Sequence, residues 1–278
     1  VLHSSEMDKS KWNQRILANN SDIYNEFDYL NAVTKDNWYG FMWGDYDRVL
    51  PFYQKKKWGF IPYICMPPFL QKFDNSKLSS NEFADVLGYL KKKNYLVDYS
   101  VSTNYYGSKF EEKDNFSLNL QSSDYEKVKG DYASLLKKNI AKASSNLSLN
   151  FNENQENVLS FLYSNDLFKQ LVLQEYRAVF ENIIDSVPRK IVSAQKDGKI
   201  VAVLIALVFN KKAYLVFPYT NDIGRKYQAM SFLIDSLIKS DEFDVIDFEG
   251  STMPSIAKFY AQFGAKKKPF GCISYRRF

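Results

Sequence analysis

The stretch DFEGSTMPSIAKFYAQFGAKK, residues 247–267, decides how the second half of the chain folds. It starts at the end of an apolar strand, Asp244–Glu249, and continues as a helix that Gly264 is placed to end. The apolar positions of this helix that share one face are Ile256, Phe259, Tyr260 and Phe263. An acidic residue followed at once by glycine, at Glu249 and Gly250, marks a sharp turn or a close backbone approach between strand and helix.

The length and composition predict two folded domains. The 278 residues exceed what most single cores hold, and ~100–150 residues is the usual domain size. The longest apolar run, Ile200–Phe209, is about half the ~20 residues that cross a bilayer and follows a tight-turn signal, so it predicts a buried strand. The first residues lack the order of a signal peptide, so we expect no transmembrane segment and a cytoplasmic location.

Few residues are available for metal or imidazole chemistry. The only histidine is His3, and the two cysteines, Cys65 and Cys272, are far apart with no CxxC partner. A zinc site, a Ser-His-Asp triad or a Cys-His dyad is therefore not expected. Catalysis would have to use carboxylates, tyrosines, backbone donors or water.

Both halves of the chain show a similar order of elements. In the second half, a helical region at 152–184 precedes strands at Arg189–Gln195, 199–209 and 211–220, a helix at Gly224–Ser240, and then the strand, helix and final strand of the opening stretch. In the first half, strands are predicted at Trp38–Gly44, Arg48–Gln54 and Trp58–Ile64, a helix at Ser80–Asn94 and a strand at Tyr95–Val101. A strand at Asn115–Gln121, a helix from the candidate N-cap Ser123 to about Ala143, and a strand at Leu147–Phe151 follow.

This order resembles the GNAT acyltransferase fold, and two copies in one chain resemble the FemABX group of tandem GNAT proteins. Two stretches carry the resemblance: DYASLLKKNIAKASSNLSLNF at 131–151, and FPYTNDIGRKYQAMSFLIDSLIKSDEFDVIDFEGSTMPSIAKFYAQFGA at 217–265. The resemblance implies an α+β chain of two GNAT-like domains, at 1–150 and 151–278. Each domain would hold a mixed, mostly antiparallel sheet flanked by helices.

The resemblance also implies a site in the second domain. There the acyl donor would enter between two strands that separate where Glu249 lies. Glu249 is then a candidate base, and Tyr219 and Tyr260 are candidate proton donors. The candidate donor-binding residues are Phe217, Tyr219, Asn221, Gly224, Arg225, Lys226, Tyr227 and Gln228, and the candidate substrate-binding residues are Phe248, Gly250 and Ser251. Two other interpretations stay open: Glu249 or Ser251 as a cap of the next helix, and the tyrosines as core residues.

The sequence departs from the acetyl-CoA signature of GNAT enzymes, Gln/Arg-x-x-Gly-x-Gly/Ala. Counted from Arg225, Gln228 and Met230 stand at the two small-residue positions. This predicts a rebuilt pyrophosphate loop, with no tightly bound cofactor and with acyl-CoA as a co-substrate.

Two classes of function follow from these patterns. The first is an acyltransferase that moves an acyl or aminoacyl group, from acyl-CoA or aminoacyl-tRNA, to a small-molecule or peptide amine. The second is a degenerate, non-catalytic module that binds a metabolite or protein. Basic residues could form a groove for tRNA or for a lipid-linked anionic substrate, but solvated faces and protected sheet edges are the favoured interpretation. These residues are Lys137, Lys138, Lys142, Lys266–Lys268, Arg276 and Arg277.

Overall fold

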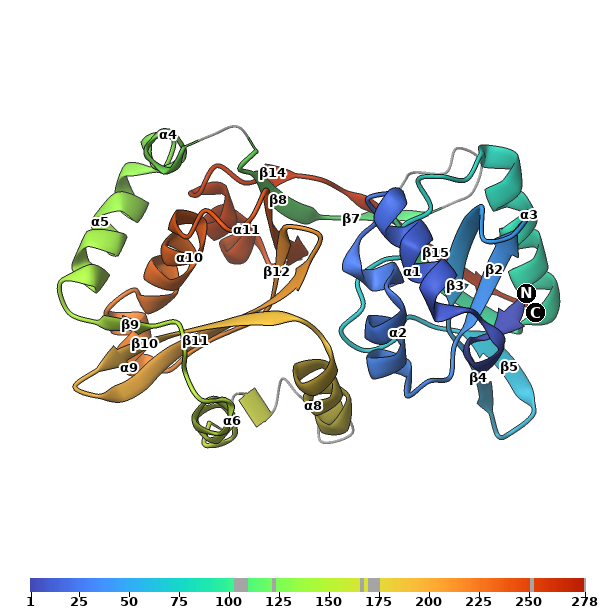
Figure 1. Ribbon diagram of the computed structural model, residues 1–278, viewed down its shortest axis with the longest axis horizontal. Coiled ribbons are helices and arrows are strands. Elements are labelled where there is room, and N and C mark those ends of the chain that lie inside the picture. The colour runs from blue at the N-terminus through green and yellow to red at the C-terminus, as the bar shows by residue number, and fades with distance from the viewer. Residues whose placement is uncertain (103–109, 122–123, 166–167, 170–175, 251–252, 278) are drawn as a thin grey trace. The chain divides into compact units, whose positions relative to one another are not determined.

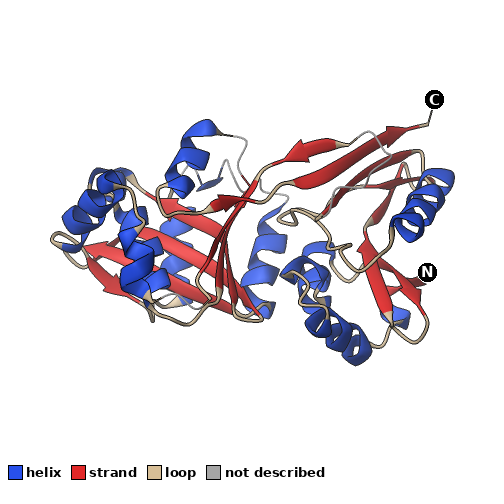
Figure 2. Cartoon of the chain, turned by 90° about the horizontal axis from the view of Figure 1, so that it is seen from above, coloured by secondary structure: helices blue, strands red, loops and turns tan. Residues whose placement is uncertain are grey.

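The structure is a computed structural model that describes residues 1–102, 110–121, 124–165, 168–169, 176–250 and 253–277 (Figure 1). The chain forms two compact units that interleave along the sequence, whereas the sequence predicts a single boundary near residue 150. Unit 1 comprises Val1–Asp114, Ala178–Val187 and Pro269–Phe278, and unit 2 comprises Asn115–Arg177 and Pro188–Lys268. Each unit combines sheet and helix (Figure 2), and the predicted α+β class is confirmed.

Unit 1 contains two sheets among its described residues. The antiparallel sheet β1-β2-β3 is formed by β1 (Leu2–His3), β2 (Tyr39–Trp43) and β3 (Arg48–Phe52). The sheet β4-β5-β6-β15-β7 is formed by β4 (Gln54–Lys57), β5 (Ile61–Ile64), β6 (Leu96–Val101), β15 (Phe270–Arg276) and β7 (Glu111–Lys113). The helices are α1 (Lys9–Ala18), α2 (Phe27–Thr34), α3 (Ser80–Lys93) and α8 (Arg177–Ser186).

Aromatic side chains fill much of the core of unit 1. Trp12 and Trp38 are each 0% exposed, and their rings meet edge to face with centroids 4.9 Å apart. The Trp12 indole donates to the carbonyl of Asn25 at 2.7 Å, and the Trp38 indole donates to Asn31 Oδ1 at 2.8 Å. Both indole N–H groups are therefore paired, so burying these rings leaves no unsatisfied donor on them.

Unit 2 contains one sheet of seven strands among its described residues, in the order β14-β8-β13-β12-β11-β10-β9. The strands are β8 (Asn115–Asn119), β9 (Ser148–Asn150), β10 (Arg189–Lys196), β11 (Lys199–Phe209), β12 (Lys212–Thr220), β13 (Val245–Gly250) and β14 (Lys266–Lys267). The helices are α4 (Tyr125–Gly130), α5 (Ser134–Ser144), α6 (Gln155–Tyr163), α9 (Asp222–Lys226), α10 (Ala229–Lys239) and α11 (Pro254–Ala261). Of the strand pairs described in unit 2, only β12 with β13 is parallel.

The predicted buried strand, β11, is the centre of unit 2. Its residues from Val201 to Leu207 are all at most 1% exposed, because helices cover both faces of the sheet here. On one face, α5 and α10 contribute Leu136, Leu233 and Leu237 to a common core. On the other face, α6 packs against β11.

Most predicted elements are confirmed, with four differences. The strand predicted at Trp58–Ile64 is only Ile61–Ile64, because Trp58, Gly59 and Phe60 form the turn between β4 and β5. The helix predicted from Ser123 is two helices, α4 and α5; Ser123 itself lies outside the described residues, and Asp124 caps α4. The helix predicted at Gly224–Ser240 is α9 followed by α10, because Gln228 takes a left-handed conformation with φ 63°. The final predicted strand divides into β14 of unit 2 and β15 of unit 1. None of the described helices has the length and apolar character needed to cross a bilayer.

One buried carboxylate links α4 to α10. Asp235 on α10 is 4% exposed and accepts the Tyr125 hydroxyl at 3.0 and 3.1 Å. Burial raises the pKa of the Asp235 carboxyl above its ordinary value. The folded state therefore holds this proton more tightly than the unfolded chain does.

We expect Asp235→Asn to be at least as stable as the wild type at neutral pH. An amide carries no charge to desolvate, and its oxygen still accepts the Tyr125 hydrogen bond. Because the folded pKa of Asp235 is raised, its contribution to stability is present below the unfolded pKa of ~3.9 and is lost as pH rises through the folded value. Urea unfolding should show that the free energy of unfolding of Asp235→Asn, relative to that of the wild type, increases as the pH rises over that range. Asp235→Ala, which removes the acceptor, should cost about 1–3 kcal/mol; an equal loss in Asn and Ala would contradict this account.

Candidate active site

The strands β12 and β13 pair for only a short distance. Their parallel register joins Lys212 to Val245, Ala213 to Ile246 and Tyr214 to Asp247, and no pairing continues toward the carboxyl ends. On its other side β12 has a bulge, because Leu207 of β11 lies opposite Tyr214 whereas Ile205 lies opposite Phe217. From Tyr214 to Phe217, β12 advances by three residues while β11 advances by two. The side chains of β12 beyond the bulge therefore lie on the face opposite to the one that an uninterrupted strand would give them. Among the described residues, the two strands are therefore paired only at the start of β12 and β13.

The bulge decides where two predicted site residues point. After it, Phe217 and Tyr219 lie opposite Ile205 and Val203, on the face of the sheet that α6 covers. The Tyr219 ring, 6% exposed, contacts Phe161 of α6 with centroids 5.7 Å apart. Tyr219 is therefore packed against aromatic residues on this face.

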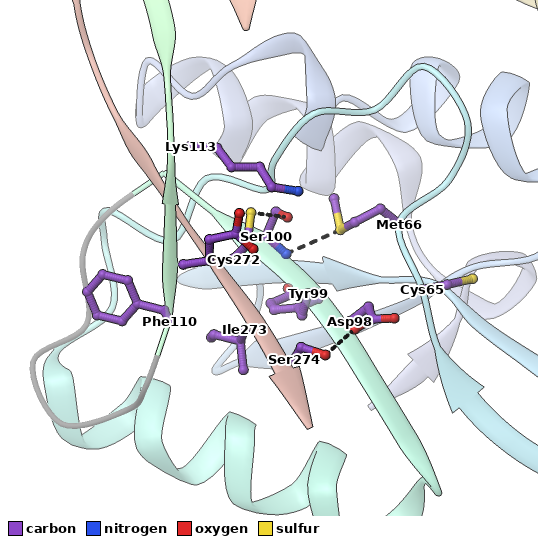
Figure 3. A pocket seen from close by; sticks show the side chains of 11 residues that line it. Cys65, Met66, Asp98, Tyr99, Ser100, Phe110, Lys113, Cys272, Ile273 and Ser274 are labelled. Carbon is purple, nitrogen blue, oxygen red and sulfur yellow. Dashed lines mark hydrogen bonds between the residues drawn. The ribbon is translucent and has the colours of Figure 1, made fainter. Parts of the chain in front are cut away.

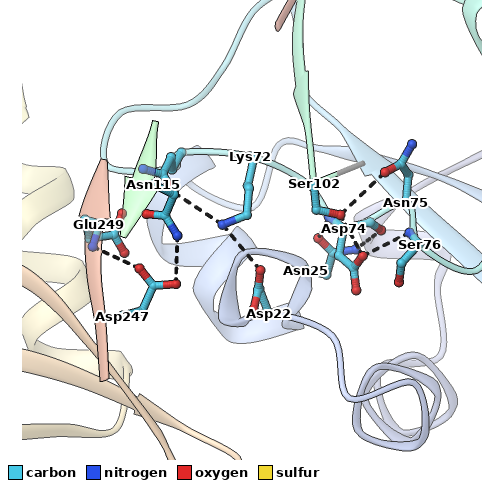
Figure 4. Close-up of polar contacts among 11 residues, drawn as sticks. Asp22, Asn25, Lys72, Asp74, Asn75, Ser76, Ser102, Asn115, Asp247 and Glu249 are labelled. Atoms are coloured by element: carbon cyan, nitrogen blue, oxygen red, sulfur yellow. Dashed lines mark hydrogen bonds and ion pairs between the residues drawn. The ribbon is translucent and has the colours of Figure 1, made fainter. Parts of the chain in front are cut away.

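The end of β13 is held in an unusual conformation. Glu249 has φ 65°, which for a side chain with a Cβ costs about 1–2 kcal/mol. Asp247, 7% exposed, accepts the backbone N–H of Glu249 at 2.9 Å and the amide Nδ2 of Asn115 at 3.1 Å (Figure 4). The Asp247 carboxylate therefore holds the backbone of the strained turn at Glu249, and Asn115 of β8 holds that carboxylate in position. Gly250 is the last paired residue of β13, opposite Asn115.

Tyr260 on α11 lies near this turn. Its ring packs on Phe248 and Phe116, with centroids 4.9 and 6.0 Å away. Burial, with a contribution from the nearby carboxylates of Glu249 and Asp247, raises the pKa of Tyr260 to about 12. Tyr260 is therefore a protonated donor at neutral pH, close to Glu249.

The structure thus brings together two of the three predicted catalytic residues. Tyr260 belongs to the core shared by α10 and α11, whereas Tyr219 follows the bulge onto the opposite face of the sheet. Phe248, predicted to contact substrate, is fully buried beneath Tyr260. The N-cap residue of α11 is Met253, whose own side chain makes no cap hydrogen bond. Ser251 lies outside the described residues.

The turn after β12 is tightly built. Asn221 caps α9 by accepting the N–H of Gly224 at 2.9 Å. A Cβ on Gly224 would lie 2.4 Å from the carbonyl oxygen of Val201 and 2.2 Å from Thr220 Oγ1, so only glycine fits here. Arg225 donates to the carbonyl of Thr220 at 2.8 Å and pairs with Asp222. The guanidinium of Arg225, which was predicted to bind the donor, is thus held at the end of β12.

The next turn leaves the N-terminus of α10 open. Gln228 is the N-cap residue in a left-handed conformation, and its side chain makes no cap; Nε2 donates back to the Arg225 carbonyl at 3.2 Å. The conformation that glycine would provide at this signature position is thus retained by glutamine. Lys142 of α5 donates to the Lys226 carbonyl at 2.7 Å. The ammonium groups of Lys196 and Lys226 lie 5.5 and 5.7 Å from the centroid of the Tyr227 ring.

A pocket of about 300 Å³ opens at this N-terminus. It is lined by Thr220, Gly224, Arg225, Gln228, Ala229, Met230, Ser231 and Phe259. The first N–H groups of a helix and a guanidinium favour an anion, so the pocket suits a phosphate group. The sequence did not predict the Asp247–Asn115 contact, because the two residues lie far apart in the chain. It also did not predict the pocket residues Thr220, Ala229, Ser231 and Phe259, which belong to no recognised motif.

Unit 1 has a different pocket where its own parallel strands separate. Tyr63 and Ile64 of β5 pair with Leu96 and Val97 of β6, and beyond them lies a pocket of about 610 Å³ (Figure 3). Its lining residues are Cys65, Met66, Asp98, Tyr99, Ser100, Phe110, Glu111, Lys113, Cys272, Ile273 and Ser274. Within it, Ser274 donates to Asp98 at 2.8 Å, and Ser100 Oγ lies 3.1 Å from Cys272 Sγ. None of these lining residues belongs to a helix, so this pocket lacks the helix N-terminus that suits a phosphate.

Solved structures share this arrangement over nearly the whole chain. A crystal structure of FemX aligns with a TM-score of 0.68 at 10% identity, covering 98% of this chain and 96% of that chain. A tandem GNAT protein from the clavulanic acid biosynthesis pathway aligns with a TM-score of 0.53 at 10% identity, covering 98% and 97%. This chain has the tandem GNAT fold. The predicted resemblance is therefore confirmed at the level of fold.

A further tandem GNAT match is the C-terminal domain (DUF2156) of a putative lysylphosphatidylglycerol synthetase from Agrobacterium fabrum. It aligns with a TM-score of 0.60 at 12% identity, covering 98% of this chain and 93% of that chain. No family model matches the sequence, and no curated protein matches it by sequence comparison. Identities this low establish a common fold and leave the chemistry to the site itself.

We expect Gly224→Ala to destabilise the turn that forms the pocket. The added Cβ meets the backbone of Val201, which cannot move without disturbing β11. The matched control is Gly88→Ala on α3, where a Cβ has open space and a helix interior gains about 0.5–1 kcal/mol from alanine. Thermal unfolding should lower the midpoint for the first variant and raise it for the second; a neutral Gly224→Ala would show that the turn is not tight.

Proposed function

We propose that this chain is an N-acyltransferase that moves an acyl or aminoacyl group from an activated donor to an amine, with the chemistry in unit 2. The supporting observation is the early separation of β12 from β13 beside the open N-terminus of α10. That separation exposes backbone groups to the donor, and the helix terminus offers N–H groups to its phosphates. Glu249 follows the paired part of β13, and its charge acts on the nearby Tyr260.

The residues of the pocket fit a pyrophosphate-bearing donor such as acyl-CoA. The N–H groups of Ala229, Met230 and Ser231 begin α10 without a side-chain cap, and Arg225 is placed beside them. Gln228 keeps the left-handed turn that aims these groups outward, although its side chain has to leave the Arg225 carbonyl. Acyl-CoA would supply a thioester carbonyl for attack.

Glu249 and Tyr260 would divide the proton transfers of the reaction. The amine nitrogen bonds to the acyl carbon, and the bond from that carbon to the leaving sulfur or ribose oxygen breaks. Glu249 accepts the proton lost by the amine, and Tyr260 gives its proton to the leaving group. In the proposed reaction the Tyr260 hydroxyl, whose raised pKa keeps it protonated, lies against the leaving atom of the donor.

The charge of Glu249 couples these two steps. Burial is the main reason why the pKa of Tyr260 is raised to about 12, and the Glu249 carboxylate adds a smaller contribution. Once Glu249 has taken the amine proton, its charge is gone and the pKa of Tyr260 falls. The tyrosine therefore becomes a better acid at the moment when the leaving group needs a proton.

We expect acyl-CoA to stabilise the protein and Gln228→Glu to abolish that effect. Ligand at about 100 times its Kd adds ~2.7 kcal/mol, which for a unit of this size raises Tm by roughly 5–10 °C. A carboxylate at residue 228 favours the N-terminus of α10 but repels phosphate, so the apo protein should stay folded. The measurement is a thermal-shift titration with acetyl-CoA and longer acyl-CoAs, because acetyl-CoA is the ligand named for the clavulanic acid tandem GNAT protein. Gln14→Glu on α1 makes the same charge change in unit 1 and should leave the shift intact.

We expect Glu249→Gln to lower kcat about 100-fold and Tyr260→Phe to lower it about 10- to 100-fold, with little change in donor binding. Both replacements keep the shape of the side chain, so the turn and the aromatic packing survive. The controls are Glu156→Gln on α6 and Tyr89→Phe on α3, both exposed positions outside the opening. The measurement is steady-state turnover with whichever donor binds, and unchanged kcat in Glu249→Gln would contradict its role as base.

Two features favour the alternative of a non-catalytic binding module. Arg225 is paired with Asp222, and Gln228 stands where acetyl-CoA enzymes have glycine. In that case donor binding has been lost, acyl-CoA would not stabilise the protein, and the ligand would be a small metabolite or a protein. If acyl-CoA gives no shift, filter binding of charged tRNA tests the aminoacyl donor, and salt-insensitive or absent retention would remove it.

A further inference from the structure

We propose that unit 1 docks on an anionic lipid bilayer through the hairpin that joins β4 to β5. This surface, the hairpin apex, consists of Lys55, Lys56, Lys57, Trp58 and Phe60. Trp58 is 72% exposed and Phe60 is 70% exposed, the two largest values among the exposed large apolar side chains described. Their rings lie side by side with centroids 6.5 Å apart, so the tip is one aromatic cluster.

The local structure of the turn does not call for a tryptophan. Trp58 has φ 53° and Gly59 has φ 80°, and the Phe60 N–H donates to the Lys57 carbonyl at 3.3 Å, as in a type I′ turn. Such turns favour asparagine or glycine at the first central position, and a bulky residue with positive φ is an outlier. The sequence thus keeps an aromatic side chain at the tip although it is unfavourable both for the turn and for exposure to water. A partner that covers Trp58 accounts for both the unfavourable turn residue and its exposure to water.

Edge protection explains the lysines but not the aromatic residues. β4 is the edge strand of its sheet, and lysines on an edge prevent strand pairing with another chain. Trp58 and Phe60 have the opposite effect, since exposed apolar side chains promote association. Lysines around an aromatic tip instead match a bilayer, in which tryptophan favours the headgroup level and ammonium groups pair with lipid phosphates.

The charge around the tip is of one sign. The sequence from Arg48 to Phe73 contains no aspartate or glutamate. Beside the tip lies a shallow hollow of about 290 Å³ lined by Lys57, Ile61, Tyr63, Tyr95, Leu96 and Arg276, with two cations and no acidic residue in its described lining. A lipid phosphate fits between Lys57 and Arg276 while the aromatic tip enters the interface.

A single-stranded nucleic acid is the other anionic partner with this chemistry, and the geometry favours it less. Nucleic acids stack bases on aromatic faces within a cationic groove. Here the aromatic side chains project from the tip of a turn, and the Lys57 ammonium already lies over the Trp58 ring at 4.7 Å. A projecting tip suits insertion into a soft surface better than it suits base stacking.

The test is flotation of the full chain with vesicles of phosphatidylcholine alone or mixed with phosphatidylglycerol. We expect binding only to the anionic vesicles, weakened by salt, with a blue shift of tryptophan emission. Trp12 and Trp38 are 0% exposed, so they do not respond, and Trp58 is the most exposed tryptophan. Trp58→Asn suits the turn, so it should raise Tm slightly while removing the blue shift and weakening binding about tenfold.

The charge contribution is tested with two matched triple variants. Replacing Lys55, Lys56 and Lys57 by Gln should weaken vesicle binding roughly a hundredfold, because each lysine near an anionic surface contributes about fivefold. The same change at the exposed run Lys266, Lys267 and Lys268 of unit 2 removes equal charge and should leave binding unchanged. Leu135→Ala, at a 60% exposed apolar position on α5, is the control for Trp58→Asn.

Three results would overturn the proposal. They are equal binding to neutral and anionic vesicles, vesicle binding that both triple variants weaken alike, and a Trp58 emission change that appears with tRNA but not with anionic vesicles. The last result would assign the hairpin apex to nucleic acid. Since all variants lie outside the opening between β12 and β13, acyl transfer can fail or succeed independently of this outcome.

Discussion

The geometry of unit 2 depends on the incomplete hydrogen-bond ladder between β12 and β13. These neighbours are joined for three residues from Lys212 to Tyr214 and then separate. The bulge in β12 bends the strand away, and the left-handed Glu249 bends β13 on the other side. Backbone groups that would pair in a regular sheet are thereby left for a ligand, at the cost of local strain that Asp247 and Asn115 offset.

Everything proposed for catalysis is arranged around that opening. The turn after β12 needs Gly224 because Val201 and Thr220 leave no room for a Cβ, and this turn places α10 with its N-terminus at the opening. On β13, the strained turn sets the carboxylate of Glu249 near Tyr260. In the proposed reaction, donor binding rests on backbone geometry and proton transfer on Glu249 and Tyr260, so no histidine is needed.

The two units use the same strand separation differently. In unit 2 the opening adjoins a helix N-terminus and an arginine. In unit 1 the corresponding strands, β5 and β6, open into a pocket lined by serine, cysteine, carboxylate and lysine side chains, and no helix begins there among the described residues. Of these two described strand openings, the one in unit 2 has a helix N-terminus and an arginine for a phosphate, which supports the proposal that the chemistry lies there. Unit 1 instead presents an aromatic and basic hairpin at its sheet edge.

The sequence by itself determined the elements whose patterns are local. Hydrophobic periodicity predicted α3, α11 and the buried β11, and the Asp197-Gly198 turn between β10 and β11 followed from residues that accept positive φ. Motif order also indicated the tandem GNAT fold. Only the tertiary structure decided the rest: that β15 joins the sheet of unit 1, that a bulge turns Tyr219 away from Tyr260, and that Asn115 supports Asp247. These depend on pairing between residues more than a hundred positions apart or on one extra residue in a strand, and neither leaves a periodic signal in the sequence.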